Sequence, residues 1–183
     1  ETRGTRLRMK AWIRVVREAG GVGDVVRMIP VLRGLRESRP EARLWVFAPA
    51  EYRVLLEGWF DEFTATPWRG RRPRDAELDE SRWPYLNVGV RFDRSVDLYC
   101  PAYRHEHSRR GEVWRDRIDL FCRAAGVSPS DRLPRMNLNP RDVEAAREYF
   151  AQEGLQDGRK VIAVQPFSTD PARNWPAANW VTL

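Results

Sequence analysis

The chain has 183 residues, of which 42% are hydrophobic and 32% are charged, and its formal net charge at pH 7 is +6. Because domains commonly hold about 150 residues, this length predicts one domain and a remainder. No stretch approaches the ~18 consecutive apolar residues that a membrane-spanning helix needs, and the first ten residues lack the apolar centre of a signal peptide. We therefore expect a soluble protein that stays in the cytoplasm.

The basic residues are almost all arginine, since Lys10 and Lys160 are the only lysines among 32. Arginine matches phosphates and carboxylates with a two-point geometry, so the bias favours an anionic partner. An arginine-rich genome or a high growth temperature explains it equally well. The arginines are scattered among acidic residues, which argues against a nucleic-acid surface.

The cysteines and histidines predict no metal site. Cys100 and Cys122 are too few for a disulfide framework and lack zinc spacing, so they are expected to be free buried thiols. His105 and His107 have no further ligand cluster beside them.

The first half of the sequence alternates strand and helix patterns. Trp12–Val16 is rich in β-branched residues, and apolar residues then recur every three or four positions after a glycine turn. The patterns predict strands at Trp12–Val16, Arg43–Phe47 and Phe63–Thr66, and helices at Asp24–Glu37 and Tyr52–Trp59.

The second half continues the alternation between two polar loops, Pro67–Pro84 and Pro101–Gly111. It predicts strands at Tyr85–Val90 and Val96–Leu98, a helix from Trp114 to Ala125 capped by Gly126, and a helix from Pro140 to about Glu153 capped by Asn139. Such alternation indicates an α/β fold, a Rossmann-like parallel sheet flanked by helices.

A second domain is expected to start near the end of the chain. Lys160–Val164 has the pattern of a buried strand, and the chain ends in what looks like the first turns of another helix. We predict an N-terminal domain over residues 1–157 and the beginning of a second Rossmann-like domain over 158–183.

The glycine turn after the first strand is the first candidate site. Gly21 and Gly23 begin a dinucleotide fingerprint, but Val26 stands where its third glycine belongs and no acidic residue closes the second strand, which argues against a nicotinamide enzyme. The turn places Asp24 at the edge of a parallel sheet where ligands bind. The alternative is that Asp24 caps the helix.

The loop after Val164 is the second candidate site. Ser168 and Thr169 lie between a predicted strand and a helix, where hydroxyl and backbone N–H groups hold phosphates, with Arg173 as the counter-charge. The alternative is an ordinary turn with Trp175 packed inward.

Taken together, the motifs resemble the heptosyltransferases of glycosyltransferase family 9. The resemblance rests on Gly21-Val22-Gly23-Asp24-Val25-Val26 with Pro30-Val31-Leu32 and Leu35-Arg36, and on Ser168-Thr169 followed by Arg173-Asn174-Trp175-Pro176. The middle stretches, Val96–Pro101 and Arg117–Cys122, are similar to more distant members described as ADP-heptose:lipopolysaccharide heptosyltransferases.

The resemblance implies a GT-B enzyme, in which an N-terminal acceptor domain faces a C-terminal nucleotide-sugar domain. Such enzymes transfer heptose from ADP-heptose to a hydroxyl of the lipopolysaccharide core, with inversion and without a metal or other cofactor. Asp24 matches the general base and Gly21 and Gly23 match the substrate-binding turn. Ser168, Thr169 and Arg173 match the donor-diphosphate site, with Arg173 in place of a common lysine.

The implied partners are an ADP-heptose-like donor and a glycan or glycolipid acceptor, without nucleic acid. Peripheral contact with the cytoplasmic face of the inner membrane is left open. The chain as given is expected to be truncated after the acceptor domain and inactive alone. Two alternatives stand: a non-catalytic α/β module that binds an anionic ligand through arginines, indifferent to Asp24, and a nucleotide-sugar epimerase of related form.

Overall fold

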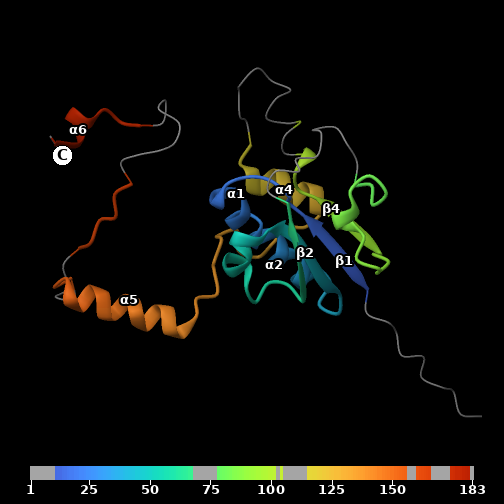
Figure 1. Ribbon diagram of the computed structural model, residues 1–183, viewed down its shortest axis with the longest axis horizontal. Coiled ribbons are helices and arrows are strands. Elements are labelled where there is room, and N and C mark those ends of the chain that lie inside the picture. The colour runs from blue at the N-terminus through green and yellow to red at the C-terminus, as the bar shows by residue number, and fades with distance from the viewer. Residues whose placement is uncertain are drawn as a thin grey trace, which may run out of the picture. The chain divides into compact units, whose positions relative to one another are not determined.

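The structure is a computed structural model that describes residues 11–67, 78–101, 104, 115–155, 160–165 and 174–181. The chain forms two compact units, Glu1–Asn137 and Leu138–Leu183. Figure 1 shows the sheet and most of the helices in the first unit. The domain boundary expected at residues 157/158 stays a prediction.

The first unit is built on a four-stranded parallel sheet in the order β3-β2-β1-β4. The strands are β1 (Trp12–Val16), β2 (Arg43–Pro49), β3 (Glu62–Thr66) and β4 (Arg94–Asp97). Val15 of the central strand β1 pairs with Val46 on one side and with Val96 on the other. The predicted α/β fold with a parallel sheet is therefore confirmed.

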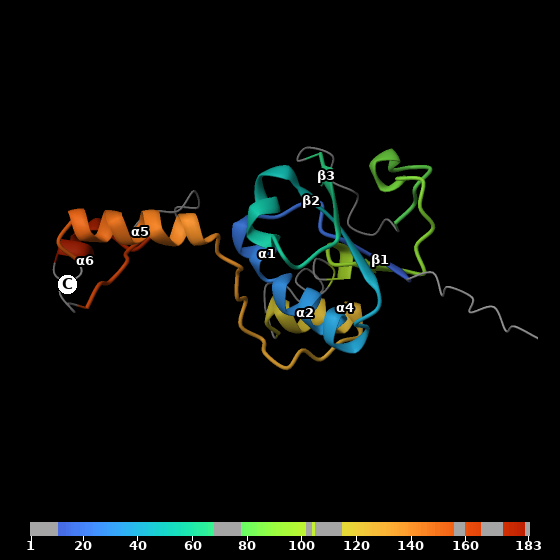
Figure 2. The same ribbon diagram turned by 90° about the horizontal axis from the view of Figure 1, so that it is seen from below.

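The main core fills the space between one face of the sheet and the helices α2 (Ile29–Ser38) and α4 (Arg117–Ala125), which pack against each other. Figure 2 shows these two helices side by side beneath the strands. Alternate strand residues point to this face because side chains in a strand alternate. The fully buried members include Ile13, Val15, Leu32, Leu44 and Phe121.

The long helix expected over Asp24–Glu37 is divided into α1 (Val22–Val26) and α2. The cause is Pro30, the second residue of α2. Proline has no backbone N–H, and its ring collides with the carbonyl four residues earlier, here that of Val26. The chain therefore turns at Arg27 and Met28 before the helix restarts.

Two other predicted helices differ in extent from the structure. The segment expected at Tyr52–Trp59 is a 3₁₀ helix, η1, over Ala50–Leu56. Helix α4 begins at Arg117, because Asp116 caps it by accepting a hydrogen bond from the N–H of Ile118 at 2.6 Å. It ends as predicted at Gly126, which has a left-handed φ of 58°.

Among the described residues, the second face of the sheet is covered by the segment 78–92 instead of by long helices. Val16 and Phe47 pack there against Leu86, with Trp45, Trp83 and four other apolar side chains around them. The strand predicted at Tyr85–Val90 is wrong. A short 3₁₀ helix, η2 (Pro84–Leu86), and a turn stand there, because Asn87 accepts a hydrogen bond from the N–H of Gly89, which has φ 70°.

The segment after α4 is fastened to α2. Arg33 of α2 is 9% exposed and donates to the carbonyl oxygens of Asp131 at 2.6 Å and Leu133 at 3.2 Å. Glu37, also in α2, accepts hydrogen bonds from the N–H and the hydroxyl of Ser130. The chain between α4 and the second unit therefore belongs to the first unit.

The second unit contains α5 (Pro140–Gln152) and α6 (Ala177–Val181). Asn139 caps α5 by accepting from the N–H of Arg141 at 2.9 Å, as the sequence predicts. The buried strand predicted at Lys160–Val164 is wrong: Ile162 is 82% exposed and the segment is not a strand. A strand of this kind is buried when neighbouring strands pair with it and helices cover both faces of their sheet, and no strand pairs with it in the part of the chain that the structure describes.

We predict that Leu86→Ala lowers the free energy of unfolding by about 2–5 kcal/mol, because Leu86 is fully buried between Val16 and Phe47. Urea denaturation measures this loss, and Val54→Ala is the control because Val54 is 64% exposed. Equal effects of the two substitutions would show that segment 78–92 is no part of the folded core.

We also predict an acid-sensitive contribution to stability at the end of α2. Hydrogen bonds from Ser130 lower the pKa of Glu37, so its folded-state pKa lies below the unfolded one. The contribution is present above the usual glutamate pKa and is lost as pH falls through the lowered value. Denaturation across acidic pH should show Glu37→Gln losing stability near neutral pH and matching the wild type in acid.

The control for this experiment is Glu41→Gln, because Glu41 is exposed and has no described partner. Its stability should follow the wild type at every pH. A Glu37→Gln protein with the wild-type pH profile would contradict the assignment.

Candidate active site

Asp24 lies beside the carboxyl-terminal edge of the sheet, in the turn that follows the central strand. β1 ends at Val16, the chain passes through Arg17–Gly20, and Asp24 is the third residue of α1. The edge is held together by backbone bonds: Arg17 N–H donates to Phe47 at 2.8 Å and Leu98 N–H donates to Val16 at 3.0 Å. Parallel α/β sheets bind their ligands at this edge.

The carboxylate of Asp24 is 14% exposed and pairs with two guanidinium groups. One oxygen is 3.2 Å from Nη2 of Arg17, and the other contacts Nη1 of Arg117. The N-cap of α1 is Gly21, and the carboxylate of Asp24 points to the arginines. The alternative that Asp24 serves as the N-cap of the helix is therefore wrong.

The two arginines differ in burial and in how firmly other contacts hold them. The side chain of Arg17 is 6% exposed, donates from Nη1 to the carbonyl of Leu98 at 3.2 Å, and lies over the rings of Tyr99 and Phe121. Arg117, the first residue of α4, is 26% exposed. Arg17 is thus a fixed partner of Asp24, whereas Arg117 lies where a ligand can reach it.

Gly20 is the glycine that this arrangement requires. Its φ of 129° is rare for other residues, and an added Cβ would lie 2.4 Å from Oδ2 of Asp24 and 2.9 Å from Nη2 of Arg17. Any side chain at this position would therefore collide with the ion pair.

Gly21 and Gly23 are placed differently. Gly21 has an ordinary φ of −80°, and nothing described lies within 4 Å of a Cβ added to either residue. The packing of the described protein therefore gives no reason for glycine at these positions. Among the described residues, nothing fills the space beside these two glycines.

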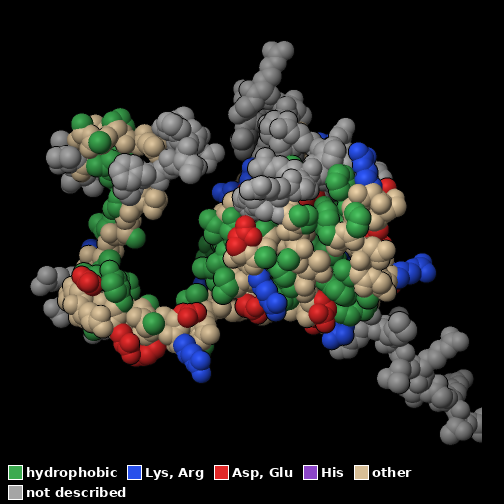
Figure 3. All heavy atoms as spheres, in the orientation of Figure 1, with side chains coloured by type: hydrophobic (Ala, Val, Ile, Leu, Met, Phe, Trp, Pro, Cys, Tyr) green, Lys and Arg blue, Asp and Glu red, His purple; other side chains and the backbone are tan. Residues whose placement is uncertain are grey.

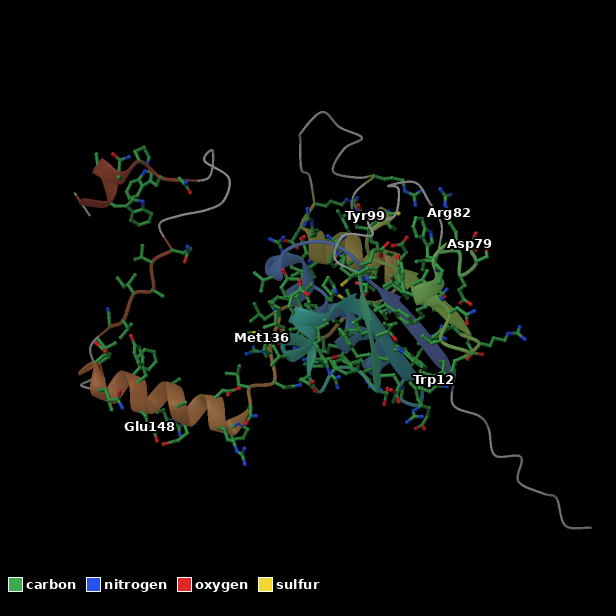
Figure 4. All side chains as sticks on the ribbon, in the orientation of Figure 1. Trp12, Asp79, Arg82, Tyr99, Met136 and Glu148 are labelled. Carbon is green, nitrogen blue, oxygen red and sulfur yellow. The ribbon has the colours of Figure 1, made fainter. Side chains whose placement is uncertain are left out.

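A buried turn after β4 completes the edge. Asp97, the last residue of β4, accepts from the N–H groups of Tyr99 at 2.8 Å and Cys100 at 3.3 Å. Tyr99 and Cys100 pack with Ala19 in a small cluster of their own, and Figure 4 labels Tyr99 there. The ends of β1 and β4 therefore form one packed support beneath Arg17.

Thr66, the last residue of β3, lies at the same edge. It is 5% exposed, and among the described residues its hydroxyl has no hydrogen-bond partner. A buried hydroxyl without a partner is uncommon and costs stability, so Thr66 marks a polar position at this edge.

The arrangement suits proton transfer from a bound hydroxyl. A carboxylate offers about four lone-pair positions, so two arginine contacts leave positions that can accept a further hydrogen bond. The buried Arg17 fixes the direction of the carboxylate, and fixed geometry is what a general base needs.

The sequence located Asp24 but missed Gly20, Arg17 and Arg117. Arg17 stands between the strand and the glycine turn, where its charge gave a signal. Arg117 begins a stretch that carries the family resemblance, but nothing in the sequence linked it to Asp24, because that contact depends on how α4 packs in the fold. Ser168, Thr169 and Arg173 lie outside the described residues, as do His105 and His107.

The described residues include no group of three or more His, Cys, Asp or Glu side chains placed to hold a metal ion. Within the same residues, no helix has the length and apolar character needed to cross a membrane. Figure 3 shows basic and acidic side chains interspersed on the visible face of the first unit, without a continuous basic strip.

No protein-family model matches the chain, and no curated protein matches it significantly. Among solved structures it is similar to a glycosyl transferase family 9 protein from Veillonella parvula DSM 2008, with 17% sequence identity and a TM-score of 0.67. The match covers 94% of this chain and 58% of that one, so the chain spans little more than half the length of the solved protein. The likeness shows that the two share an α/β Rossmann-like fold.

Proposed function

We propose that this chain is the acceptor-binding part of an inverting GT-B glycosyltransferase, with Asp24 as the general base. The observation that carries the proposal is the carboxylate of Asp24, held by a buried arginine beside an open glycine turn at the ligand-binding edge of the sheet. The similarity in fold to a family 9 glycosyl transferase supports it.

In this reaction an acceptor hydroxyl attacks the anomeric carbon of the donor sugar from the side opposite the diphosphate. A new C–O bond forms, the bond to the diphosphate breaks, and the configuration inverts. Asp24 accepts the proton that the hydroxyl loses, and the nucleoside diphosphate leaves with the bonding electrons. Such a base contributes typically 10²–10⁴-fold, given hydrogen-bond reach of the hydroxyl.

The donor is assigned to the second domain. Ser168, Thr169 and Arg173 contact the diphosphate in this proposal, and Arg173 stabilises the charge that develops on the leaving group. The donor is an ADP-heptose-like nucleotide sugar, and the acceptor is a lipopolysaccharide-core or other glycan hydroxyl. No metal takes part, and the enzyme works in the cytoplasm or at the cytoplasmic face of the inner membrane.

On the acceptor side, Arg117 is the second residue assigned to binding. Its guanidinium contacts Asp24, and its side chain is 26% exposed where that of Asp24 is 14% exposed. In this proposal Arg117 holds a neighbouring oxygen of the acceptor whose hydroxyl meets Asp24.

We predict that Asp24→Asn, in protein carrying both domains, lowers turnover with ADP-heptose by about 10²–10⁴-fold, because the amide cannot accept the proton. Release of ADP measures the rate, and thermal unfolding checks that the variant is folded. The matched control is Asp119→Asn, because Asp119 also pairs with an arginine, Arg132, but at an exposed site. Near-normal transfer by Asp24→Asn would overturn the base assignment, whereas absence of transfer by the wild type would favour the non-catalytic binding module.

The glycine turn gives a second prediction. Gly20→Ala should destabilise the protein by about 1–3 kcal/mol, because its φ is unfavourable for alanine and its Cβ meets the ion pair. Gly21→Ser should leave stability intact, because serine is a preferred N-cap and its Cβ enters open space.

If an acceptor occupies that space, Gly21→Ser lowers kcat/KM while the melting temperature stays the same. Steady-state kinetics and thermal unfolding of the two variants separate these effects. Unchanged kinetics in Gly21→Ser would show that the turn does not meet the substrate.

A further inference from the structure

Arg14 is a buried cation on the second face of the sheet, away from Asp24. It stands in the middle of β1, opposite Trp45 on one side and Ser95 on the other, and is 5% exposed. Its Nη1 donates to Glu80 at 2.6 Å and to the carbonyl of Leu86 at 3.3 Å, and its Nε donates to Ser95 at 3.1 Å.

One end of this guanidinium takes no part in these described contacts. Nη2 of Arg14 has no hydrogen-bond or ion-pair partner among the described residues. Two open hollows of about 560 and 400 Å³ meet at Arg14 and Glu80. An arginine that is buried in a sheet and yet borders hollows on the surface offers a fixed donor to whatever enters them.

The hollows are lined mostly by polar side chains of the covering segment. The larger one is bordered by Leu78, Asp79, Glu80, Ser81 and Arg82, and the smaller one by Asn87, Gly89, Val90, Arg91, Phe92 and Ser95. Arg91 has no described partner of its own, and Ser95 is exposed. Figure 4 labels Asp79 and Arg82 on this segment.

The smaller hollow is lined by Phe92, the first of three contacting aromatic rings that we call the aromatic wall. Phe92 lies 5.0 Å below the Arg14 guanidinium, and its ring meets Trp45 edge to face at 5.8 Å. Trp45 in turn contacts Trp12 at 5.3 Å. All three rings are partly exposed. The face of an aromatic ring carries partial negative charge, so it attracts the polarised C–H groups on the flat side of a sugar.

Charge decides the class of ligand. In the larger hollow two arginines, Arg14 and Arg82, face two carboxylates, Asp79 and Glu80, so the charges there balance, while Arg91 adds one exposed positive charge to the lining of the smaller hollow. A phosphate in the larger hollow would meet both carboxylates and lose much of what the arginines offer. A sugar hydroxyl both donates and accepts, so neighbouring guanidinium, carboxylate and amide groups suit a ligand with several hydroxyls.

We propose that these two hollows form a second binding site, one for a neutral sugar residue, centred on Arg14. The guanidinium Nη2 donates to a ring hydroxyl, Glu80 accepts from a neighbouring one, and the flat side of the sugar lies against the aromatic wall. The site is separate from Asp24, and it does not depend on the proposed transfer reaction.

The test is a titration of the ¹⁵N-labelled 183-residue chain, followed by NMR, with methyl α-D-mannopyranoside, methyl β-D-glucopyranoside and, separately, inorganic phosphate. We expect saturable shifts at millimolar sugar in the amides of Ser81 and Gly89 and in the indole N–H groups of Trp12 and Trp45. Shifts with phosphate alone would overturn the sugar assignment. No saturable shift with either sugar, or shifts confined to the Asp24 turn, would overturn the site.

Variants make the test specific. Arg14→Lys should abolish saturation, and Arg91→Ala, at an exposed position, should weaken binding about three- to tenfold, the range of one or two lost hydrogen bonds. Arg53→Ala is the matched control, because Arg53 also lies over aromatic rings, those of Phe60 and Phe63, but lines neither hollow. If Arg14→Lys fails to fold, Arg91→Ala decides: unchanged affinity contradicts the proposal.

Asp24→Asn separates this proposal from the transferase. It should bind the sugars with wild-type affinity, because Asp24 is not among the residues that line the hollows. Loss of sugar binding in that variant would place the ligand at the Asp24 edge and overturn the second site. If Asp24→Asn leaves sugar transfer unaffected, the base assignment fails, and the titration at Arg14 still tests the second site independently.

Discussion

The first unit depends on the contacts that buried arginine side chains make with carboxylates, backbone carbonyls and aromatic rings. Arg14, Arg17 and Arg33 are each at most 9% exposed, although burial of an unpaired charge costs several kcal/mol. Each guanidinium meets a carboxylate, a backbone carbonyl and an aromatic ring. Lysine cannot supply these contacts together, because its ammonium lacks the planar fork that bonds in two directions while its face lies on a ring.

These three arginines join segments that are distant in the sequence. Arg14 fastens the covering segment 78–92 to the sheet, Arg17 joins the glycine turn to the end of β4, and Arg33 fastens the chain after α4 to α2. The arginine content has a structural role at these positions, whatever raised it across the whole sequence. Removal of one partner of a buried ion pair leaves an unpaired buried charge and strongly destabilises the protein, so each of these contacts also fixes where its segment lies.

The sequence predicted the strands best where burial is strongest. Trp12–Val16 coincides with β1 residue for residue, because its residues other than Arg14 are aromatic or β-branched, the types that favour strands. Predictions failed where one residue overrides a pattern. Pro30 divides a periodic helix, and Asn87 with Gly89 turns an apolar stretch that otherwise resembles a strand. Neither effect changes the apolar spacing on which the prediction relied.

Only part of the candidate site could be predicted from the sequence, because some of its contacts join residues that are far apart in the chain. Asp24 was found because its partners in the motif are close in sequence, whereas Arg117 is 93 positions away and meets it through the packing of α4. Gly20 was passed over in favour of Gly21 and Gly23, since sequence alone does not show which glycine has a positive φ. The structure separates the roles of these glycines. A Cβ at Gly20 would collide with the Asp24–Arg17 ion pair, whereas no described atom lies within 4 Å of a Cβ added at Gly21 or Gly23.

The central strand links the two proposed sites. Side chains alternate along β1, so Arg14 reaches the second face, while Arg17, just past the strand's end, turns to the carboxyl edge. Both guanidinium groups donate to backbone carbonyls beside the sheet, that of Leu86 in η2 for Arg14 and that of Leu98, just after β4, for Arg17. A shift of β1 along its neighbours would displace both groups at once, so the register of one strand sets the geometry of both sites.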